Sequence, residues 1–212
     1  MIKLAKLDNK KLKEILRKIN TDTNTRELYS SKLSKILNFL NKNTGFKNAA
    51  VKPVGSRIKQ TDLKESDMEV IFCTSPNKNH VEVRKLLLEK AKEAFGKPAK
   101  IKLGNEAVHI DFKNPKCNFD IVYLTQEKFK IKSKKIKKIR KMRPLHKKAI
   151  KLVKYTFNEA NLDNVYSYEV ELACLTLKDD ILADCVNNLI KYFKGRIKKK
   201  GLTINKIIKY LI

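Results

Sequence analysis

The chain has 212 residues, of which 42% are hydrophobic, and its 49 lysines and arginines outnumber its 22 acidic residues to give a net charge of +27 at pH 7. This apolar content argues against a disordered chain, and the length suits one domain or a core with a smaller lobe. No apolar run approaches the ~18 residues that a membrane helix needs, and no N-terminal stretch resembles a signal peptide. We therefore expect a folded, cytoplasmic protein with no membrane partner.

The positive charge predicts a polyanionic partner, because a surface with this field attracts phosphates. Nucleic acid, whether RNA or DNA, is the commonest polyanion available to such a protein. A lysine bias from an AT-rich genome, or adaptation to high temperature, would produce the same composition without this partner. The charge carries no information on nucleotide sequence specificity.

Cysteine and histidine are too scattered to predict a zinc site. The three histidines stand far apart in the sequence, and no two cysteines form a CxxC pair. Each cysteine has apolar neighbours, where a thiol behaves as a small hydrophobic group. This usage is typical of an intracellular, reducing environment. The cysteines are Cys73, Cys117, Cys174 and Cys185.

In chain order, the first part of the sequence combines helices and strands. Helical periodicity appears at residues 8–20 and 24–42, and an apolar segment at 49–54 predicts a strand that ends at Gly55. A second strand is expected at 67–73. The remaining elements of this part are a helix at 80–95 and strands near 100–104, 107–113 and 118–124, the last two joined by a turn at Asn114-Pro115.

A strongly basic segment follows the last predicted strand. It covers residues 128–143, and ten of its sixteen residues are lysine or arginine. Its apolar members Ile136, Ile139 and Met142 recur every third residue, which predicts a helix with one buried edge and a basic exterior. The alternative is a solvated run of charge.

From residue 144 onward the pattern is wholly helical. Segments with helical periodicity lie near 145–160, 167–177, 179–193 and 202–211. We therefore predict an α+β protein in two parts, with residues 1–143 forming a core that includes the N-terminal helices and residues 144–212 forming a helical lobe.

Asp67 and Glu69 form the most informative pair of acids. Side chains at i and i+2 of a strand point the same way, so these carboxylates share one face while Met68, Val70 and Phe72 share the core face. Two neighbouring carboxylates repel unless a cation joins them. Hard divalent cations prefer oxygen ligands, and Mg²⁺ normally completes its shell with substrate phosphate. The pair therefore indicates a metal site.

Upstream of these acids, Gly55 and Ser56 suit a phosphate. A glycine at the end of a strand lets the backbone turn tightly and approach a ligand, and a serine at the start of the next helix offers a hydroxyl and an N–H donor. A phosphate-binding turn followed by a carboxylate pair is typical of a site for a nucleoside triphosphate. In such a site a third carboxylate commonly helps to position the attacking hydroxyl. Asp120 and Asp111 are the candidates, and we favour Asp120 because its strongly apolar neighbours indicate a strand deep in the sheet.

This arrangement resembles the nucleotidyltransferase superfamily typified by DNA polymerase beta, whose signature is Gly-Ser, a gap, Asp-x-Asp or Glu-x-Asp, and a distant third Asp. The segment 55–72 is most similar to the oligoadenylate synthetases, the cyclic GMP-AMP synthase group and the archaeal CCA-adding enzymes. These share a loop threonine, matched by Thr61, and a Ser-Asp step, matched by Ser66-Asp67. Glu69 departs from the Asp of most members, and Gln60 departs from the glycine common before the threonine.

A second block, residues 149–175, is similar to the helical substrate-binding lobe of the synthetases. The likeness implies that Lys151 and Lys154 reach the triphosphate, that Ser167 bonds a phosphate and that Tyr168 stacks on a nucleobase. Lysines three residues apart lie about one helical turn apart and can face the same way. The alternatives are surface lysines, an ordinary helix cap at Ser167 and a core aromatic at Tyr168.

The resemblance implies a mixed-sheet nucleotidyltransferase core followed by a helical nucleotide-binding lobe. Asp67, Glu69 and Asp120 would hold two Mg²⁺ ions, or Mn²⁺, and Gly55 and Ser56 would hold the β,γ-phosphates. The implied enzyme joins nucleotides from ATP or a related triphosphate into short or cyclic oligonucleotides, releases pyrophosphate and responds to nucleic acid. The alternatives are a template-independent transferase that extends an RNA 3′ end and a catalytically weak nucleic-acid-binding module.

Overall fold

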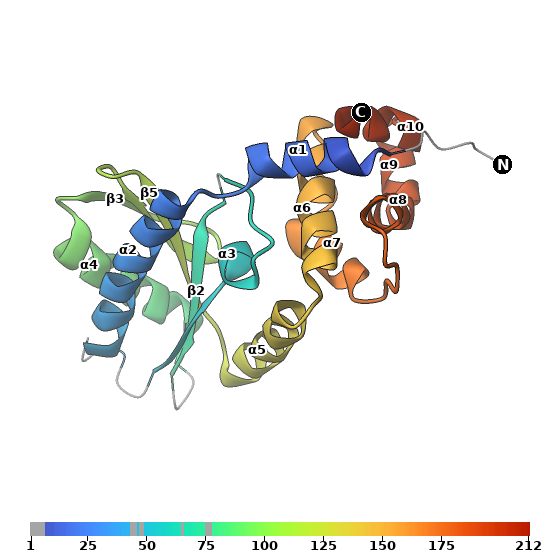
Figure 1. Ribbon diagram of the computed structural model, residues 1–212. Coiled ribbons are helices and arrows are strands. Elements are labelled where there is room, and N and C mark those ends of the chain that lie inside the picture. Colours follow the sequence, from blue (N-terminus) through green and yellow to red (C-terminus); the bar gives the residue numbers. More distant parts are fainter. Residues whose placement is uncertain (1–6, 43–45, 47–48, 65, 75–77) are drawn as a thin grey trace. The chain divides into compact units, whose positions relative to one another are not determined.

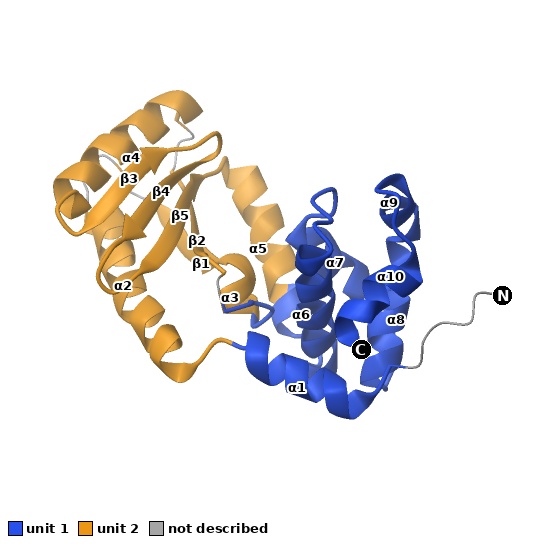
Figure 2. Ribbon diagram, turned by 90° about the horizontal axis from the view of Figure 1, so that it is seen from above, with its two compact units in different colours: residues 1–20, 60–64, 138–212 blue, residues 21–59, 65–137 orange. Residues whose placement is uncertain are grey.

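The computed structural model describes residues 7–42, 46, 49–64, 66–74 and 78–212. The chain forms two compact units, which Figure 2 shows in different colours. The helical unit contains residues 1–20, 60–64 and 138–212, and the sheet unit contains residues 21–59 and 65–137. Within the described ranges, no helix is long and apolar enough to cross a membrane.

The sheet unit is built on a five-stranded sheet with the order β1-β2-β5-β4-β3. The central strands β2 and β5 are parallel and the other neighbouring pairs are antiparallel, so the sheet is mixed, as predicted. Asn114 and Pro115 lie in the turn between β4 and β5, which also agrees with the prediction. The strands are β1 (Ala50–Val54), β2 (Met68–Cys73), β3 (Ala99–Leu103), β4 (Ala107–Phe112) and β5 (Cys117–Tyr123).

Helices α2 (Thr23–Lys42) and α4 (His80–Phe95) cover one face of this sheet (Figure 1). Met68, Val70 and Phe72 point into the core on this face, as the alternation along β2 predicts. The apolar residues of the two helices recur at helical spacing and complete that core. Those of α2 are Tyr29, Ile36 and Leu40, and those of α4 are Val83, Leu87, Ala91 and Phe95.

The opposite face carries a second, smaller core. Ile71 of β2 packs with Val54 of β1 and with Ile136 of α5 (Gln126–Arg140). The basic segment is therefore a helix with a buried edge, as predicted, although the helix ends at Arg140, before Met142. Because α5 covers Ile71, β2 is buried on both faces at this point and becomes half-exposed only at Glu69.

The helical unit is organised around α6 (Pro144–Glu159). Its apolar residues Ala149, Ile150, Leu152 and Val153 are fully buried, as expected of a helix that is apolar on several sides. The other helices of the unit pack around this core. They are α1 (Asn9–Ile19), α7 (Ser167–Cys174), α8 (Leu182–Tyr192), α9 (Lys194–Lys199), α10 (Ile204–Ile208) and the 3-10 helix η2 (Lys209–Leu211).

The N-terminal helix α1 is grouped with the C-terminal helices rather than with the sheet. Its apolar stripe of Leu12, Leu16 and Ile19 belongs to the core that α6 and α8 also build. The predicted division at residue 143 assigns α1 to the first part, so the compact units differ from it at this helix. Periodicity identifies an amphipathic helix but does not tell which core its apolar face will join.

Truncation of Leu12 tests this packing. Leu12 is fully buried, so Leu12→Ala should lower the free energy of unfolding by about 2–5 kcal/mol through lost burial and the cavity that remains. The measurement is urea denaturation followed by circular dichroism. Leu103→Ala is the control, because Leu103 is 46% exposed on β3 and its loss should cost less than about 0.5 kcal/mol. Equal effects of the two variants would contradict the packing of α1.

Candidate active site

The parallel pairing of β2 with β5 brings two of the predicted acids side by side. Glu69 and Asp120 are register partners on these neighbouring strands, which lie about 4.8 Å apart. Asp67 is exposed and precedes the first residue of β2 by one position. The preference for Asp120 over Asp111 agrees with this register, because Asp111 lies opposite Asn118 on β4, one strand further from β2.

The charges of Asp67 and Glu69 act on the carboxyl group of Asp120. The pKa of Asp120 is raised, chiefly because the carboxyl is partly buried and also because Asp67 and Glu69 place negative charge nearby. A hydrogen bond and the charge of His109 act in the opposite direction. A folded-state pKa above the unfolded value means that this group costs stability as the pH rises through those values. A cation at this position would relieve the repulsion.

His109 is a residue of the site that the sequence did not reveal. It pairs in register with Asp120 across β4 and β5, and its Nδ1 lies 2.6 Å from Asp120 Oδ1. A hairpin that is symmetric about the Asn114-Pro115 turn places residue 109 opposite residue 120. The predicted position of this turn could therefore have identified His109 as the neighbour of Asp120. His109 therefore orients one carboxylate oxygen of Asp120.

Gly104 makes room for this histidine. A Cβ atom at residue 104 would overlap Nε2 and Cδ2 of the His109 ring. The backbone N–H of Gly104 also donates to the carbonyl of Ala107 at 2.8 Å, which holds the turn against the ring. A larger residue at this position would displace the imidazole from Asp120.

Lys132 supplies a cation to the second acid. Its ammonium, on α5, forms an ion pair with Oε1 of Glu69. The side chain of Lys132 is 39% exposed and that of Glu69 is 28% exposed, so the pair is only partly shielded from water. Two elements outside β2 and β5 therefore each bring one proton-donating group to the acids, His109 from β4 and Lys132 from α5.

Gly55 meets two constraints at the end of β1. Its φ of +81° lies in the left-handed region, and an added Cβ would stand 3.1 Å from the Cβ of Glu69. Only glycine accommodates both the turn and this close approach without strain. Ser56 follows within the short helix α3 (Gly55–Lys59). The predicted phosphate-binding pair is thus directly beside one of the predicted metal ligands.

Gln60 also adopts a left-handed conformation, with a φ of 63°. For a residue with a side chain this costs roughly 1–2 kcal/mol, which gives a physical reason for the glycine that the family resemblance leads one to expect here. The side chain of Gln60 accepts a hydrogen bond of 3.1 Å from Lys147 Nζ.

The lysines of the second block are buried, so the alternative of surface lysines is wrong. Lys154 is 4% exposed, and its Nζ lies 2.6 Å from Glu171 Oε1, which also accepts a 2.6 Å hydrogen bond from Thr61. Lys151 is 6% exposed and donates to Asn20 Oδ1 at 2.9 Å. Both lysines therefore hold other parts of the helical unit, and their contact with a triphosphate stays a prediction.

At the start of α7, both alternatives for the predicted ligand-binding residues are wrong. Tyr166, rather than Ser167, is the cap residue, and its N–H donates to Glu169 Oε2 at 2.8 Å. Tyr168 is 56% exposed and therefore no core aromatic. Its ring stacks on Tyr166 with a centroid distance of 6.0 Å and an interplanar angle of 11°.

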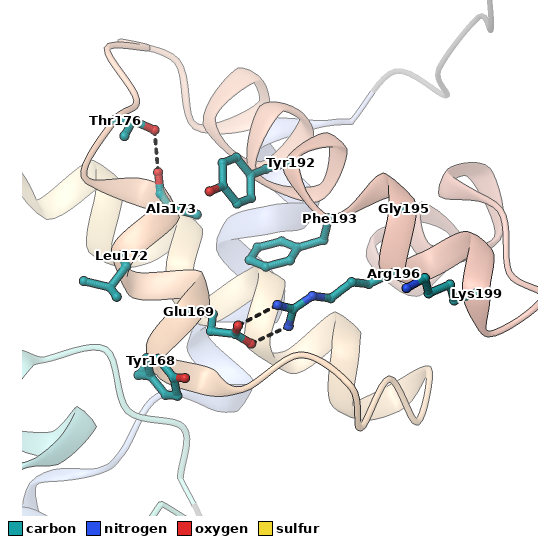
Figure 3. Close-up of a pocket in the computed structure, with 10 residues that line it drawn as sticks. All are labelled: Tyr168, Glu169, Leu172, Ala173, Thr176, Tyr192, Phe193, Gly195, Arg196 and Lys199. Carbon is teal, nitrogen blue, oxygen red and sulfur yellow. Dashed lines mark hydrogen bonds and ion pairs between the residues drawn. The ribbon is translucent and has the colours of Figure 1, made fainter.

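Tyr168 also lines a pocket of about 500 Å³ in the helical unit (Figure 3). Tyr192 and Phe193 supply further aromatic surface. Arg196 is engaged by Glu169 through two hydrogen bonds of 2.6 and 2.7 Å, which lower the pKa of Glu169. Three of the ten lining residues are therefore aromatic, and the arginine of the pocket is already paired.

The acids suit a divalent metal by residue type. Carboxylate oxygens are hard ligands, and their mutual repulsion is what a bound cation removes. Within the described residues, no three His, Cys, Asp or Glu side chains are already gathered into a metal-binding cluster. Glu69 and Asp120 are paired with Lys132 and His109, so metal binding requires at least Lys132 to give way.

The four cysteines belong to the apolar interior. All four are free and buried. Burial raises the pKa of Cys174 to about 12 and that of Cys185 to about 11, so both thiols stay protonated at neutral pH.

No protein-family model matches the sequence, and none of the curated proteins matches it. Solved structures do match in fold. The CdnC–HORMA complex of E. coli MS115-1 aligns over 90% of this chain and 72% of its own, with a TM-score of 0.67 and 15% identity. The CdnE cyclic dinucleotide synthase of Elizabethkingia meningoseptica, solved with GTP and Apcpp, aligns over 96% of both chains with a TM-score of 0.67 and 13% identity.

The Cid1 poly(U) polymerase, solved with Mg and 3′-dATP, covers 87% of this chain and 72% of its own, with a TM-score of 0.69 and 11% identity. At 11–15% identity these likenesses concern the fold. The chain therefore has the nucleotidyltransferase fold, as the sequence motifs predicted.

The buried pair of Lys154 and Glu171 makes a stability prediction. Glu171→Ala leaves an ammonium buried without its carboxylate, which should lower the free energy of unfolding by about 3–5 kcal/mol. Denaturant unfolding measures this change. Glu93→Ala, which breaks the more exposed pair with Lys90, is the control and should cost less than about 1 kcal/mol. A cost for Glu171→Ala no larger than that of the control would contradict the buried pair.

Removal of His109 should change the titration of Asp120. His109 lowers the pKa of Asp120 through its hydrogen bond and charge, so His109→Ala should raise that pKa further. A carbon-13 NMR titration of the carboxyl group measures the shift. His80→Ala is the control, because His80 bonds instead to the backbone carbonyl of Tyr123. A fall in the Asp120 pKa in His109→Ala would show that the two side chains do not interact in this way.

Proposed function

We propose that the protein is a metal-dependent nucleotidyltransferase that joins nucleotides from ATP or a related triphosphate into short or cyclic oligonucleotides. The observation that carries the proposal is the register of Glu69 with Asp120, within the field of Asp67 and directly beside Gly55. Acids on separate strands next to a tight glycine turn provide oxygen ligands and a phosphate-binding backbone in one place. The nucleotidyltransferase fold supports this assignment.

Each candidate site residue of the sheet unit has a proposed role. Asp67, Glu69 and Asp120 would hold two Mg²⁺ ions, or Mn²⁺, which supply Lewis-acid stabilisation of charge on the phosphates. Gly55 and Ser56 would bind the β,γ-phosphates through backbone N–H groups and the serine hydroxyl. They would thus keep the leaving pyrophosphate in line with the attacking oxygen.

Asp120 is suited to accept a proton. Its raised pKa makes its carboxylate a stronger base than an ordinary aspartate, and His109 holds one of its oxygens in place. As the hydroxyl oxygen bonds to the α-phosphorus, its proton passes to Asp120 and the bond to pyrophosphate breaks. Asp120 must be charged to accept this proton.

In the helical unit, the nucleotide-binding roles rest on the sequence resemblance and on one structural feature. Tyr168 is exposed and held against Tyr166, so it offers a fixed aromatic face on which a nucleobase can stack. Ser167, Lys151 and Lys154 would contact the phosphates, and Lys154 would do so only on exchange of its contact with Glu171.

A second reaction is supported by the same fold, because the Cid1 poly(U) polymerase shares it. In that reaction the acceptor is the 3′ end of an RNA rather than another triphosphate. In both reactions a hydroxyl oxygen bonds to the α-phosphorus of a triphosphate, and only the molecule that carries the hydroxyl differs. They are separated by incubation with labelled triphosphates in the presence and absence of RNA, which yields either free short products or a lengthened RNA.

The metal site is tested by Asp67→Asn, which removes one negative charge at nearly constant size. Loss of a metal ligand should lower pyrophosphate release by at least roughly 100-fold, about 2.7 kcal/mol of transition-state stabilisation. The assay uses labelled triphosphates with Mg²⁺ or Mn²⁺. Asp111→Asn is the matched control and should keep most of the activity, since Asp111 lies on β4 opposite Asn118. Full activity of Asp67→Asn would remove the proposed site.

A further inference from the structure

A basic groove lies between the edge strand β1 and helix α5, within the sheet unit. It encloses about 500 Å³ and is lined by residues 50–52 and by Phe129, Lys130, Ser133 and Lys134. Its charged residues are three lysines, Lys52, Lys130 and Lys134, and no acid contributes to the lining. A groove with this charge favours an anionic ligand.

Ser133 supplies an independent indication of a ligand. Its hydroxyl oxygen is buried and has no hydrogen-bond partner among the described residues. Such a group costs about 1–3 kcal/mol when it stays unsatisfied, so native structures seldom retain one without a purpose. The same serine lines the groove. On turning toward the groove, this hydroxyl would donate to a phosphate oxygen bound there, which supplies the acceptor that the described residues do not.

A basic track continues from the groove along α5. Lys137 is exposed and lies seven residues after Lys130 and three after Lys134, so these lysines share one side of the helix. A helix of 15 residues is about 22 Å long. A nucleic-acid strand carries one phosphate per about 3.4 Å of duplex axis, so several phosphates can follow α5. A ligand with many phosphates uses this track better than a single nucleotide does.

The apolar part of the lining favours an unpaired strand. Ala50, Val51 and Phe129 provide surface for a sugar or a base, and Phe129 is only partly buried. Base stacking on aromatic side chains is typical of single-strand binding and tolerates different bases. In a duplex the bases are stacked inside the helix and would not reach this surface.

We propose that this groove is a phosphate-binding anchor for single-stranded nucleic acid, with Ser133, Lys130 and Lys134 as its ligands. The inference goes beyond the proposed function by adding a nucleic-acid-binding surface, and it needs neither the metal site nor a particular product. A strand held on α5 would also lie on the helix that carries Lys132, the partner of Glu69.

Binding is measured by fluorescence anisotropy of a labelled 20-nucleotide RNA with the full chain. Lys130→Ala/Lys134→Ala should weaken binding at least about 10-fold and reduce the magnitude of the salt slope by about 1.4, the value for two phosphates on a single strand. Lys85→Ala/Lys92→Ala removes the same charge from exposed lysines of α4 and should weaken binding less than about 3-fold. Equal losses in both double variants would show attraction by net charge alone and overturn the proposal.

Ser133→Ala tests whether RNA is bound by a specific hydrogen bond in the groove or only by the positive charge of the surface. It removes a buried, unsatisfied hydroxyl, so the variant should be at least as stable as the parent protein. We expect it to weaken RNA binding about 5-fold while leaving the salt slope unchanged, because the lost contact is a hydrogen bond and no charge is removed. Unchanged affinity in Ser133→Ala overturns the groove as the binding site, and so does tighter binding of a duplex of equal length.

Failure of this inference can be told from failure of the proposed reaction. Asp67→Asn should bind the RNA as the parent protein does, because Asp67 is not part of the groove lining. If products form but Lys130→Ala/Lys134→Ala binds RNA normally, only the groove is refuted. If no products form but that double variant loses binding, the reaction is refuted and the groove stands.

Discussion

The parallel pairing of β2 with β5 is the constraint on which the candidate site depends. Parallel neighbours need a crossover connection, and here α4, β3 and β4 lie between the two strands in the chain. Val70 and Ile121 are both buried next to Glu69 and Asp120, so apolar packing fixes the register that sets the acids side by side. A slip of either strand by one residue would turn the acid of that strand into the core, which makes this register costly to change.

The repulsion that this register creates is balanced from two directions. His109 reaches Asp120 from β4, and Lys132 reaches Glu69 from α5. The first contact depends on the absence of a side chain at Gly104. The carboxylates are therefore oriented by neighbours that are themselves held by the sheet and by the small core around Ile136. This preorganisation is what a site for charged substrates needs.

Much of the fold followed from sequence patterns, because alternation and helical periodicity report local burial. They predicted the strands, the buried edge of α5 and the shared core face of Met68, Val70 and Phe72. Partners across the fold were beyond such patterns. His109 was missed because pairing across a hairpin depends on the register, and the burial of Lys154 was missed because its partner Glu171 lies on another helix.

The division of the chain into units has a topological consequence. Residues 60–64 belong to the helical unit although the segments on both sides of them belong to the sheet unit, so the backbone passes from one unit to the other four times. Thr61 in this insert donates its hydroxyl to the buried Glu171. Neither unit is thus a continuous stretch of polypeptide. A single proteolytic nick or a single gene truncation cannot release either one intact. Shuffling between homologues would have to carry three segments together for the helical unit and two for the sheet unit.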